Sequence, residues 1–390
     1  MEQRRFSGKS HWYHETQART CHADVQPLVP EAARVNDRFL LDLVVPDDVL
    51  HAHHAWLTVA RDAGDHLLPD TVTPSRLATL TAYDRLSTAL TVAQVSGVQR
   101  LCNHYAARLA PLPGPDSSRE SNRRLAQITQ YARQLASSPT LIDARARIQL
   151  AEVGLTDADR VTFNQIVGFI GFQARVIAVL QALNGQPARW LPGIDIQQDA
   201  PVERFAAAAA PQWQPDIPLP APGYLRPEQT QALTEAQRIE AMQPLAEGLV
   251  GDEAALSLLS ALVEALYQGP DAALVALISA RINGSSDCFA RMTRAISDAA
   301  LSDAVRNGER ALLAWSHNHP RERALIQAAQ ALTRSPDRFS AAHLQPVSDV
   351  DVPRDVLLRL LGLTALCGWL NRLKIGLGSA PSGQTAASSG

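Results

Sequence analysis

The chain has 390 residues, of which 46% are hydrophobic and 19% are charged, and its formal net charge is -3. This length suits two domains, because single domains usually hold ~100–200 residues. The near-neutral balance lacks the clustered basic excess of a nucleic-acid-binding protein, so no nucleic-acid partner is expected.

The N-terminal sequence and the cysteines favour a cytoplasmic protein. The first residues, MEQRRFSGKSHWYHE, are basic and polar with no apolar stretch behind them, so no secretory signal is predicted. The most apolar run, 166–183, contains Gln173 and Arg175, so no membrane span is expected either. The four cysteines stand far apart, without the spacing of a disulfide scaffold. They are Cys21, Cys102, Cys288 and Cys367.

The first half of the chain predicts an N-terminal arm followed by a helical domain. Residues 1–45 are mixed and polar, which predicts a poorly ordered arm. The first domain is predicted over 46–190, with a helix-rich lead-in at its start. Within it, residues 80–95 form an apolar, alanine-rich helical run, and a longer run over 156–183 opens with a Thr-Asp start signal.

The second half begins after a proline-rich break. Residues 191–240 are predicted to be an extended linker, because prolines at this density forbid a continuous helix. A second helical domain is predicted over 241–378, with helices at 272–282 and 353–377, and the small polar tail 379–390 is predicted to be disordered. No alternating strand pattern occurs, so the predicted fold class is all-α.

The two predicted domains resemble each other at three landmarks that recur in the same order. Each landmark is a pair of segments, one in each predicted domain. The first pair is 84–97 and 271–284, the second is 135–139 (LASSP) and 332–336 (LTRSP), and the third is 171–175 (GFQAR) and 368–372 (GWLNR). The two segments of the first pair are 187 residues apart, and those of the second and third pairs are 197 apart. An insertion of ten residues in the second copy, between the first and second landmarks, accounts for this difference. We interpret the chain as a tandem duplication.

The ordered landmarks resemble a known family. An apolar helix ends at Asn283-Gly284 and leads into Ser285-Ser286-Asp287-Cys288, followed by an Arg-Glu-Arg helix, the Ser-Pro break and the closing Gly368–Arg372 segment. The first copy matches through Asn103-His104-Tyr105 and Gly171–Arg175. This order resembles the carboxymuconolactone decarboxylase / alkylhydroperoxidase D-like family, within its peroxidase-related branch, over roughly residues 75–185 and 245–378.

The resemblance implies two tandem alkylhydroperoxidase D-like helical domains and a homo-oligomer, since members of the family assemble as rings. Active members carry Cys-x-x-Cys-x-x-x-His after the Asn-Gly turn. Here Ser285 stands at the first cysteine position, Cys288 at the second and Met292 at the histidine position. Ala273 stands where those members have a glutamate on the preceding helix. A dithiol mechanism within one copy is therefore not predicted.

Four residues are the candidates for catalysis. Cys288 would be the third residue of its helix if Ser285 caps it, and free N–H groups there stabilise a thiolate, while a small buried cysteine is the plainer alternative. Ser285 is predicted to be the cap rather than a nucleophile. Cys102 and His104 lie two apart, on different flanks of a helix, whereas Arg100 and His104 lie four apart and would share a face. His104 would be a proton relay or a structural histidine.

No cofactor is predicted. Two histidine groups, His51, His53 and His54 and then His317 and His319, lack the His-x-x-x-His spacing that places two ligands on one helical face. Gly284 is a lone turn glycine without a preceding strand, so no phosphate-binding loop is present.

Three functions remain open from the sequence. The first is a peroxidase-related oxidoreductase that reduces an organic hydroperoxide with the Cys288 thiol, using an external thiol or a resolving cysteine such as Cys102. The second is a duplicated domain without chemistry that serves binding or assembly. The third is thiol-free decarboxylase or lactone chemistry, in which His104 and Arg100 bind a carboxylate substrate.

Overall fold

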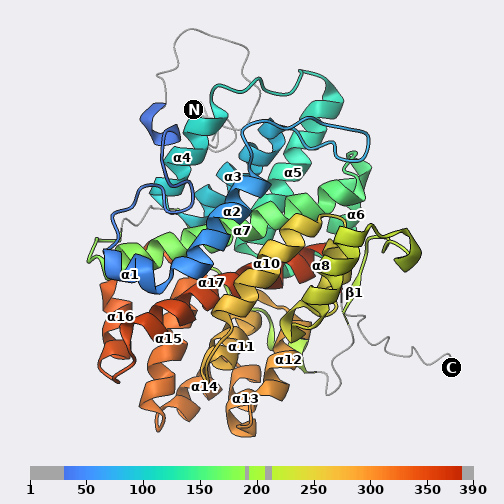
Figure 1. Cartoon of the computed structure of the whole chain (residues 1–390). Coiled ribbons are helices and arrows are strands. Elements are labelled where there is room, and N and C mark those ends of the chain that lie inside the picture. The colour runs from blue at the N-terminus through green and yellow to red at the C-terminus, as the bar shows by residue number, and fades with distance from the viewer. Residues whose placement is uncertain (1–29, 189–192, 207–212, 380–390) are drawn as a thin grey trace, which may run out of the picture.

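The computed structural model describes residues 30–188, 193–206 and 213–379, and within them the chain is almost entirely α-helical (Figure 1). Only one pair of two-residue strands occurs there, β1 (Gln214–Pro215) and β2 (Gly378–Ser379), which pair antiparallel. The predicted all-α class is therefore confirmed. The residues before 30 and the tail from 380 lie outside the described part, and with them most of the predicted arm and nearly all of the predicted tail.

Seven helices form the first half within residues 30–188, which the structure describes. They are α1 (Asp47–Ala52), α2 (His54–Leu67), α3 (Ala82–Ser96), α4 (Gln99–Leu109), α5 (Arg119–Ser137), α6 (Ala144–Glu152) and α7 (Asp157–Leu183), with 3-10 turns η2 (Pro30–Ala33) and η3 (Pro139–Leu141). The predicted helices over 80–95 and 156–183 correspond to α3 and α7. Thr156 caps α7 as its start signal predicts, because its hydroxyl accepts a hydrogen bond from the Asp159 amide.

Two short helices and three 3-10 turns lie between the halves, in η4 (Val202–Phe205), η5 (Pro222–Tyr224), α8 (Pro227–Gln237), η6 (Glu240–Met242) and α9 (Leu245–Leu249). The extended linker predicted over 191–240 is thus partly helical. Pro227 is the first residue of α8, a position where the missing amide hydrogen costs nothing. The predicted arm also needs correction at its end, because Phe39, Leu40 and Leu41 are buried in the core.

Eight helices form the second half. They are α10 (Glu253–Leu266), α11 (Ala272–Asn283), α12 (Ser286–Ala295), α13 (Ala299–Arg306), α14 (Glu309–Ser316), α15 (Pro320–Arg334), α16 (Ala341–Ser348) and α17 (Arg354–Leu377), with the 3-10 turn η7 (Pro336–Arg338). The helices predicted over 272–282 and 353–377 correspond to α11 and α17. Both α13 and α14 lie in the interval where the landmark spacing requires ten additional residues.

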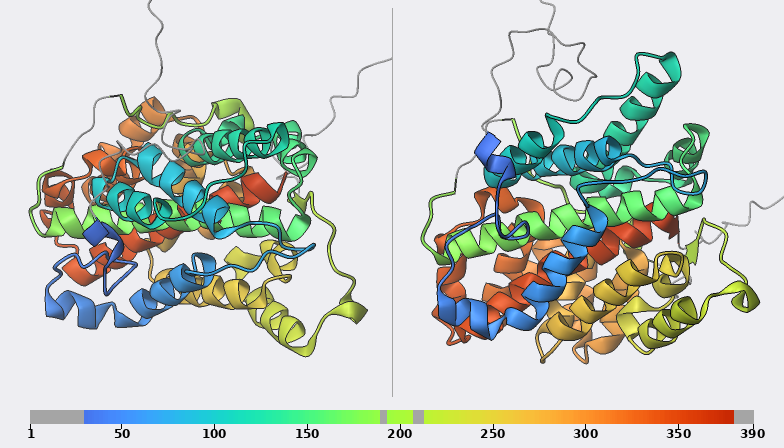
Figure 2. Two further views of the ribbon diagram at one scale, coloured as in Figure 1. Left: turned by 90° about the horizontal axis from the view of Figure 1, so that it is seen from above. Right: turned by 45° about the horizontal axis from the view of Figure 1, so that its top comes forward.

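The long helices α7 and α17 run side by side through the middle of the molecule in both views (Figure 2). Gly168 permits their close approach, because a Cβ there would overlap the Trp369 indole. By length and apolar character alone both helices would be able to cross a membrane, and 89% of the most apolar window of each is buried inside the protein. Burial of this kind is the behaviour of core helices.

Two buried arginines join the halves through matching contacts. Arg175 Nη2 donates to the Thr333 carbonyl oxygen at 2.6 Å, and Arg372 Nη2 donates to the Ala136 carbonyl oxygen at 2.7 Å. Both donors and both acceptors are 197 residues apart in the sequence. Each arginine therefore ties its own long helix to the end of a helix in the other half, α15 or α5, just before the Ser-Pro break.

Candidate functional site

A cavity of about 570 Å³, called the Gly97 cavity below, lies between the end of α3 and the start of α4. Helix α3 ends at Gly97, whose backbone is left-handed (φ 69°), a conformation that glycine adopts without strain. The cavity walls come from η2, the start of α4, the residues just after α7, and η7 of the second half. Its lining is Ala32, Val35, Leu41, Gly97, Val98, Gln99, Arg100, Asn103, His104, Gln181, Gln186, Pro187, Ala188, Pro336, Asp337 and Phe339.

His104 lines this cavity, and one of its ring nitrogens is buried without a hydrogen bond from the described residues. Its ring is 1% exposed, and Nδ1 lies 2.8 Å from the Ala32 carbonyl oxygen, which only accepts hydrogen bonds. Nδ1 therefore carries the hydrogen, and Nε2 of the neutral ring holds a lone pair. Among the described residues Nε2 is buried without a hydrogen-bond partner. Burial lowers the pKa of His104 to about 4, so the ring is neutral at physiological pH.

Asp337 supplies the second unpartnered atom, and it comes from the other half of the chain. It lies in η7 and packs directly against Gly97, where an added Cβ would stand 2.7 Å from the Asp337 Cβ. Its Oδ2 is buried without a hydrogen-bond partner in the described part of the chain, and Arg338 Nε lies 3.8 Å away. Burial raises the pKa of the Asp337 carboxyl group, and the Arg338 charge opposes that rise.

Arg100 provides the positive charge. It stands one helical turn before His104, and both line the cavity, as their spacing predicts. Arg100 Nη1 donates to the Leu41 carbonyl oxygen at 2.7 Å, which orients the guanidinium but does not neutralise it. The cavity thus combines a cation, a neutral imidazole and a buried carboxyl group, and convergent polar groups with perturbed pKa values are typical of binding and catalytic sites.

The corresponding turn of the second half is filled by protein. Helix α11 ends at Gly284, also left-handed (φ 82°), but here Ala200 and Arg204 lie against the glycine. The Ala200 amide donates to the Ile282 carbonyl oxygen, and Arg281 donates to the Ala200 carbonyl oxygen. Phe205 of η4 packs on Phe289 of α12, with ring centroids 4.6 Å apart. Residues 200–205 therefore occupy the position that corresponds to the cavity.

The polar groups of α12 satisfy one another, unlike those of α4. At the 187-residue spacing of the first landmark, Asp287 corresponds to Arg100 and Arg291 to His104. Arg291 Nε lies 3.1 Å from Asp287 Oδ2, and the buried Lys374 ammonium contacts the same oxygen. These two cations hold the pKa of Asp287 below its usual range against the effect of burial.

None of the candidates Cys102, Ser285 and Cys288 is among the residues that line the cavity. Cys288 is the third residue of α12 and half-buried, with Ser285 at the cap position as predicted. The Ser285 side chain, however, makes no capping hydrogen bond. Cys102 lies in α4, whereas α12 lies at the opposite end of the molecule (Figure 1). The structure therefore does not bring Cys102 to Cys288 as a resolving thiol.

Cys367 lies closer to Cys288 than Cys102 does. It is buried in α17, and burial raises the pKa of its thiol, with an added contribution from the nearby Cys288. Both thiols also raise the pKa of Tyr267, after the larger effect of burial. The Tyr267 hydroxyl donates to Met292 Sδ at 3.0 Å, so the position where the resembling family has a histidine holds a thioether acceptor.

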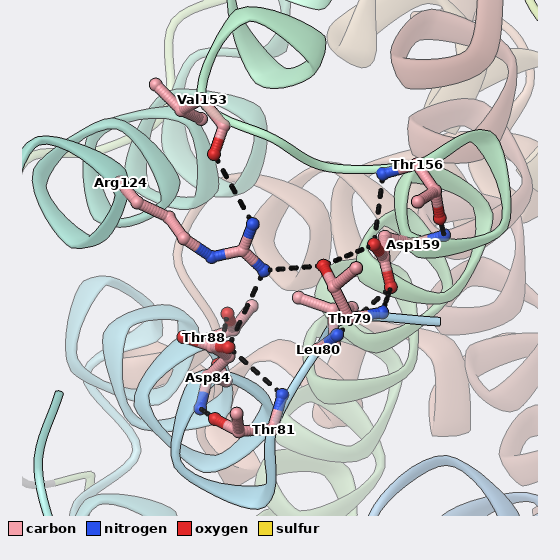
Figure 3. A network of polar contacts seen from close by, with 9 residues as sticks. All are labelled: Thr79, Leu80, Thr81, Asp84, Thr88, Arg124, Val153, Thr156 and Asp159. Atoms are coloured by element: carbon pink, nitrogen blue, oxygen red, sulfur yellow. Dashed lines mark hydrogen bonds and ion pairs between the residues drawn. The ribbon is translucent and has the colours of Figure 1, made fainter. Parts of the chain in front are cut away.

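A second polar cluster stabilises the fold (Figure 3). Arg124 lies between the Thr79 hydroxyl, at 3.0 Å, and the Asp84 carboxylate, at 3.7 Å. The Asp159 carboxylate accepts hydrogen bonds from the Thr79 hydroxyl and from the backbone amides of Thr79 and Leu80. A cavity of about 380 Å³ beside this network is lined by Asp84 and Arg124, whose charges are already paired. It therefore offers a ligand less than the Gly97 cavity does.

The histidines considered for a metal make other contacts. His53 Nδ1 accepts a hydrogen bond from Trp56 Nε1 at 3.1 Å, and His319 stacks on Trp315 with centroids 3.9 Å apart. Among the residues that the structure describes, no three His, Cys, Asp or Glu side chains group closely enough to hold a metal ion.

Comparison with known proteins does not add to this picture, since no family model matches the chain and a search of the curated proteins finds no significant relative. The candidate site therefore depends on its own geometry. Sequence reasoning identified His104 and Arg100 but missed Asp337. Its signal was available, because Asp337 directly follows the Ser335-Pro336 landmark, whose counterpart in the first half is followed by Thr140.

Proposed function

We propose that the protein is a thiol-independent enzyme that binds a small carboxylate in the Gly97 cavity and acts on it by proton transfer, as in decarboxylase or lactone chemistry. One observation carries the proposal. Arg100, His104 and Asp337 line one cavity, and the buried atoms His104 Nε2 and Asp337 Oδ2 make no hydrogen bond with any described residue. A ligand or an ordered water that reaches these atoms would recover part of the ~1–3 kcal/mol that an unpaired buried polar atom costs.

Arg100 would hold the substrate. A guanidinium binds a carboxylate through charge-assisted hydrogen bonds, and its bond to Leu41 leaves other N–H groups for that purpose. The amide side chains of Gln99, Asn103 and Gln181 add polar contacts to the same cavity. Apolar contact comes from Val98 and Phe339, so the lining suits a molecule with one charged end.

His104 would act as the base. Its Nε2 lone pair accepts a proton from a C–H or O–H bond of the substrate, whose electron pair stays on the substrate, and the ring becomes an imidazolium whose Nδ1–H remains bonded to Ala32. A bound carboxylate adds negative charge beside the ring and raises the pKa of His104 toward neutrality. The imidazolium would then return this proton to the product, which restores the neutral ring.

Thermal-shift and calorimetric titration with a panel of small carboxylates tests the proposal. We expect some carboxylates to raise the melting temperature of the natural protein, and His104→Phe to weaken their binding at least ~10-fold. His53→Phe is the control, because His53 is also buried but does not line the cavity. Absence of any carboxylate effect, or equal binding by His104→Phe, would contradict the proposal.

A thiol peroxidase centred on Cys288 is the second candidate. Its support is the position of Cys288 in the first turn of α12, where free amide hydrogens favour a thiolate. The thiolate would attack a hydroperoxide oxygen, giving a sulfenic acid and an alcohol, and an external thiol would reduce the sulfenic acid with release of water. The ionised Asp287 beside Cys288 opposes thiolate formation, which places this function second.

Alkylation kinetics separate the two candidates. In the peroxidase case, the Cys288 thiol should titrate well below the usual ~8.5, and Cys288→Ala should abolish hydroperoxide consumption while Cys102→Ala retains it. In the carboxylate case, Cys288→Ala should leave ligand binding unchanged.

We further infer that the chain is a duplicated pair of alkylhydroperoxidase D-like domains that works as a cytoplasmic homo-oligomer. The arginine contacts support the duplication, and so do the ion pairs Asp84–Arg124 and Asp271–Arg321, whose members occupy corresponding positions in the two halves. Light scattering on the purified protein would establish its mass in solution. Should neither carboxylates nor hydroperoxides bind, the non-catalytic role in binding or assembly remains.

A further inference from the structure

A second cavity, of about 380 Å³, lies beside the ion pair of Arg124 and Asp84 and is called the Arg124 cavity below. Both residues line it, and their side chains are 20% and 11% exposed. Its walls also include Leu112, Pro113 and Leu125, so the cavity combines a charged pair with apolar contact. The volume falls within the ~300–1,000 Å³ usual for small-molecule sites.

The charged pair of this cavity is open, unlike its counterpart in the second half. Arg124 Nη2 and Asp84 Oδ2 are 3.7 Å apart, which is too long for a hydrogen bond. At the corresponding positions of the second half, Arg321 and Asp271 form two hydrogen bonds of 2.7 Å each. The same two residue types therefore close on each other in one half and stand apart in the other.

Residues that only the first half has draw Arg124 away from its partner (Figure 3). Arg124 Nη2 donates to the Thr79 hydroxyl at 3.0 Å, and that hydroxyl donates in turn to Asp159 at 2.6 Å. Thr79 corresponds to Leu266 at the spacing of the first landmark. Asp159 corresponds to Val356 at the spacing of the other two. Neither apolar residue is able to make these hydrogen bonds, so the open pair is a property of this half alone.

The open pair leaves one donor and one acceptor for a ligand. Arg124 Nη1 donates to the Val153 carbonyl oxygen, and Arg124 Nε makes no hydrogen bond with any described residue. Asp84 Oδ2 accepts from the Thr81 amide, and Asp84 Oδ1 makes no hydrogen bond with the described residues either. Neither Nε nor Oδ1 belongs to the fully buried atoms without a partner, so both keep exposed surface.

We propose that the Arg124 cavity binds a small neutral molecule through a carboxamide group, whose carbonyl oxygen accepts from the Arg124 guanidinium and whose N–H group donates to the Asp84 carboxylate. An anion would meet the Asp84 charge and a cation the Arg124 charge, whereas a carboxamide is neutral and carries an acceptor beside a donor. The Arg124 and Gly97 cavities share no lining residue, and this inference does not depend on the proposed function.

Dissociation constants of four probes that share one ring test the inference on the full chain, by ligand-observed NMR or calorimetric titration. The probes are benzamide, acetophenone, benzoate and benzylamine. We expect benzamide to bind ~10-fold more tightly than acetophenone, which has the acceptor but no donor for the carboxylate. Benzylamine should bind no better than acetophenone. Absence of benzamide binding overturns the inference, and so does binding of acetophenone or benzylamine that is as tight as that of benzamide.

Matched variants locate the binding. Arg124→Gln should weaken benzamide binding at least ~10-fold, whereas Arg321→Gln, at the corresponding position of the closed pair, should leave it unchanged. Ser121→Leu narrows the cavity without altering the pair and should also weaken benzamide binding, which tests the site where Arg124→Gln does not fold. Arg100→Gln should retain benzamide binding, and any benzoate binding that it loses belongs to the Gly97 cavity. Equal losses in Arg124→Gln and Arg321→Gln, or no loss in Ser121→Leu, overturn the inference.

Discussion

The turns at Gly97 and Gly284 have the same backbone conformation, and side chains crowd both glycines, Asp337 and Ile194 at Gly97 and Thr140 and Ala200 at Gly284. Each closes an apolar helix and opens a shorter one, and each contacts the segment after the Ser-Pro break of the other half. Beside Gly97 there is a cavity with unpartnered polar atoms. Beside Gly284, residues 200–205 fill the space, and the nearby charges pair with one another. One side of the framework therefore has a cavity, and the other side is packed.

The difference lies in how polar groups are satisfied. Asp287 and Arg291 form an ion pair within one helix turn, and Lys374 completes it. Arg100 and His104, at the corresponding positions, have no such mutual partner. A protein that leaves buried polar atoms unpaired loses stability at that place, and such losses concentrate where a ligand binds. The comparison therefore supports the proposal that the ligand site lies on the Gly97 side.

The largest expected effect is on the filled side. Phe205→Ala removes a buried ring that packs on Phe289 and lies under the Arg281 guanidinium, so the free energy of unfolding should fall by about 3 kcal/mol. Urea denaturation measures this loss. Carboxylate binding should not change. A fall in carboxylate affinity in Phe205→Ala would contradict the distinction between the two sides.

A matched pair of glycine substitutions comes next. An alanine Cβ at Gly97 would stand 2.7 Å from Asp337 Cβ, and one at Gly284 would stand 2.8 Å from Thr140 Cγ2. With the added strain of a left-handed alanine, each variant should lose about 2 kcal/mol of stability. Only Gly97→Ala should also weaken carboxylate binding in calorimetric titration. If Gly284→Ala weakened it equally, the site would not be confined to one side.

Removing the cation should affect affinity more than stability. Arg100→Gln is expected to weaken carboxylate binding ~10-fold, or about 1.4 kcal/mol, because the charge-assisted contact is lost. Arg291→Gln is the control at the position corresponding to His104, and it should leave affinity unchanged while slightly destabilising the protein through Asp287. If Arg291→Gln weakened carboxylate binding and Arg100→Gln did not, the proposed ligand site at Gly97 would be contradicted.

The smallest effect concerns a contact away from both turns. His66 Nε2 lies 2.9 Å from Asp252, joining α2 to α10, and this hydrogen bond raises the pKa of His66. A raised pKa means that the stabilisation is complete below about pH 6.5 and is lost as the pH rises through the folded-state value. The lowered pKa of Asp252 sets the other limit, since the contribution disappears as the pH falls through that value.

Because both side chains are about one third exposed, solvent screening should keep this contribution below ~1 kcal/mol. Urea denaturation of the natural protein and of His66→Gln should therefore differ at pH 5.5 and converge at pH 8.5. A difference that grows toward high pH would contradict the sign of the pKa shift. Carboxylate affinity should be the same in both proteins.

Local signals in the sequence predicted much of the fold. The apolar runs specified α3, α7, α11 and α17, and Thr156 specified where α7 begins, because helix propensity and capping depend on neighbouring residues. The proline-rich segment was less informative. Proline excludes a continuous helix but also favours the first position of a new one, so the helix that begins at Pro227 was missed.

The sequence by itself determined the all-α class, the turns at Gly97 and Gly284, and the shared face of Arg100 and His104, since each follows from residues within a few positions of one another. Only the tertiary structure decided which turn has a cavity. Asp337 packs against Gly97 from more than two hundred residues away, and residues 200–205 cover Gly284 from outside its own helices. Contacts of such long sequence separation depend on how α7 and α17 pack, which no local pattern encodes.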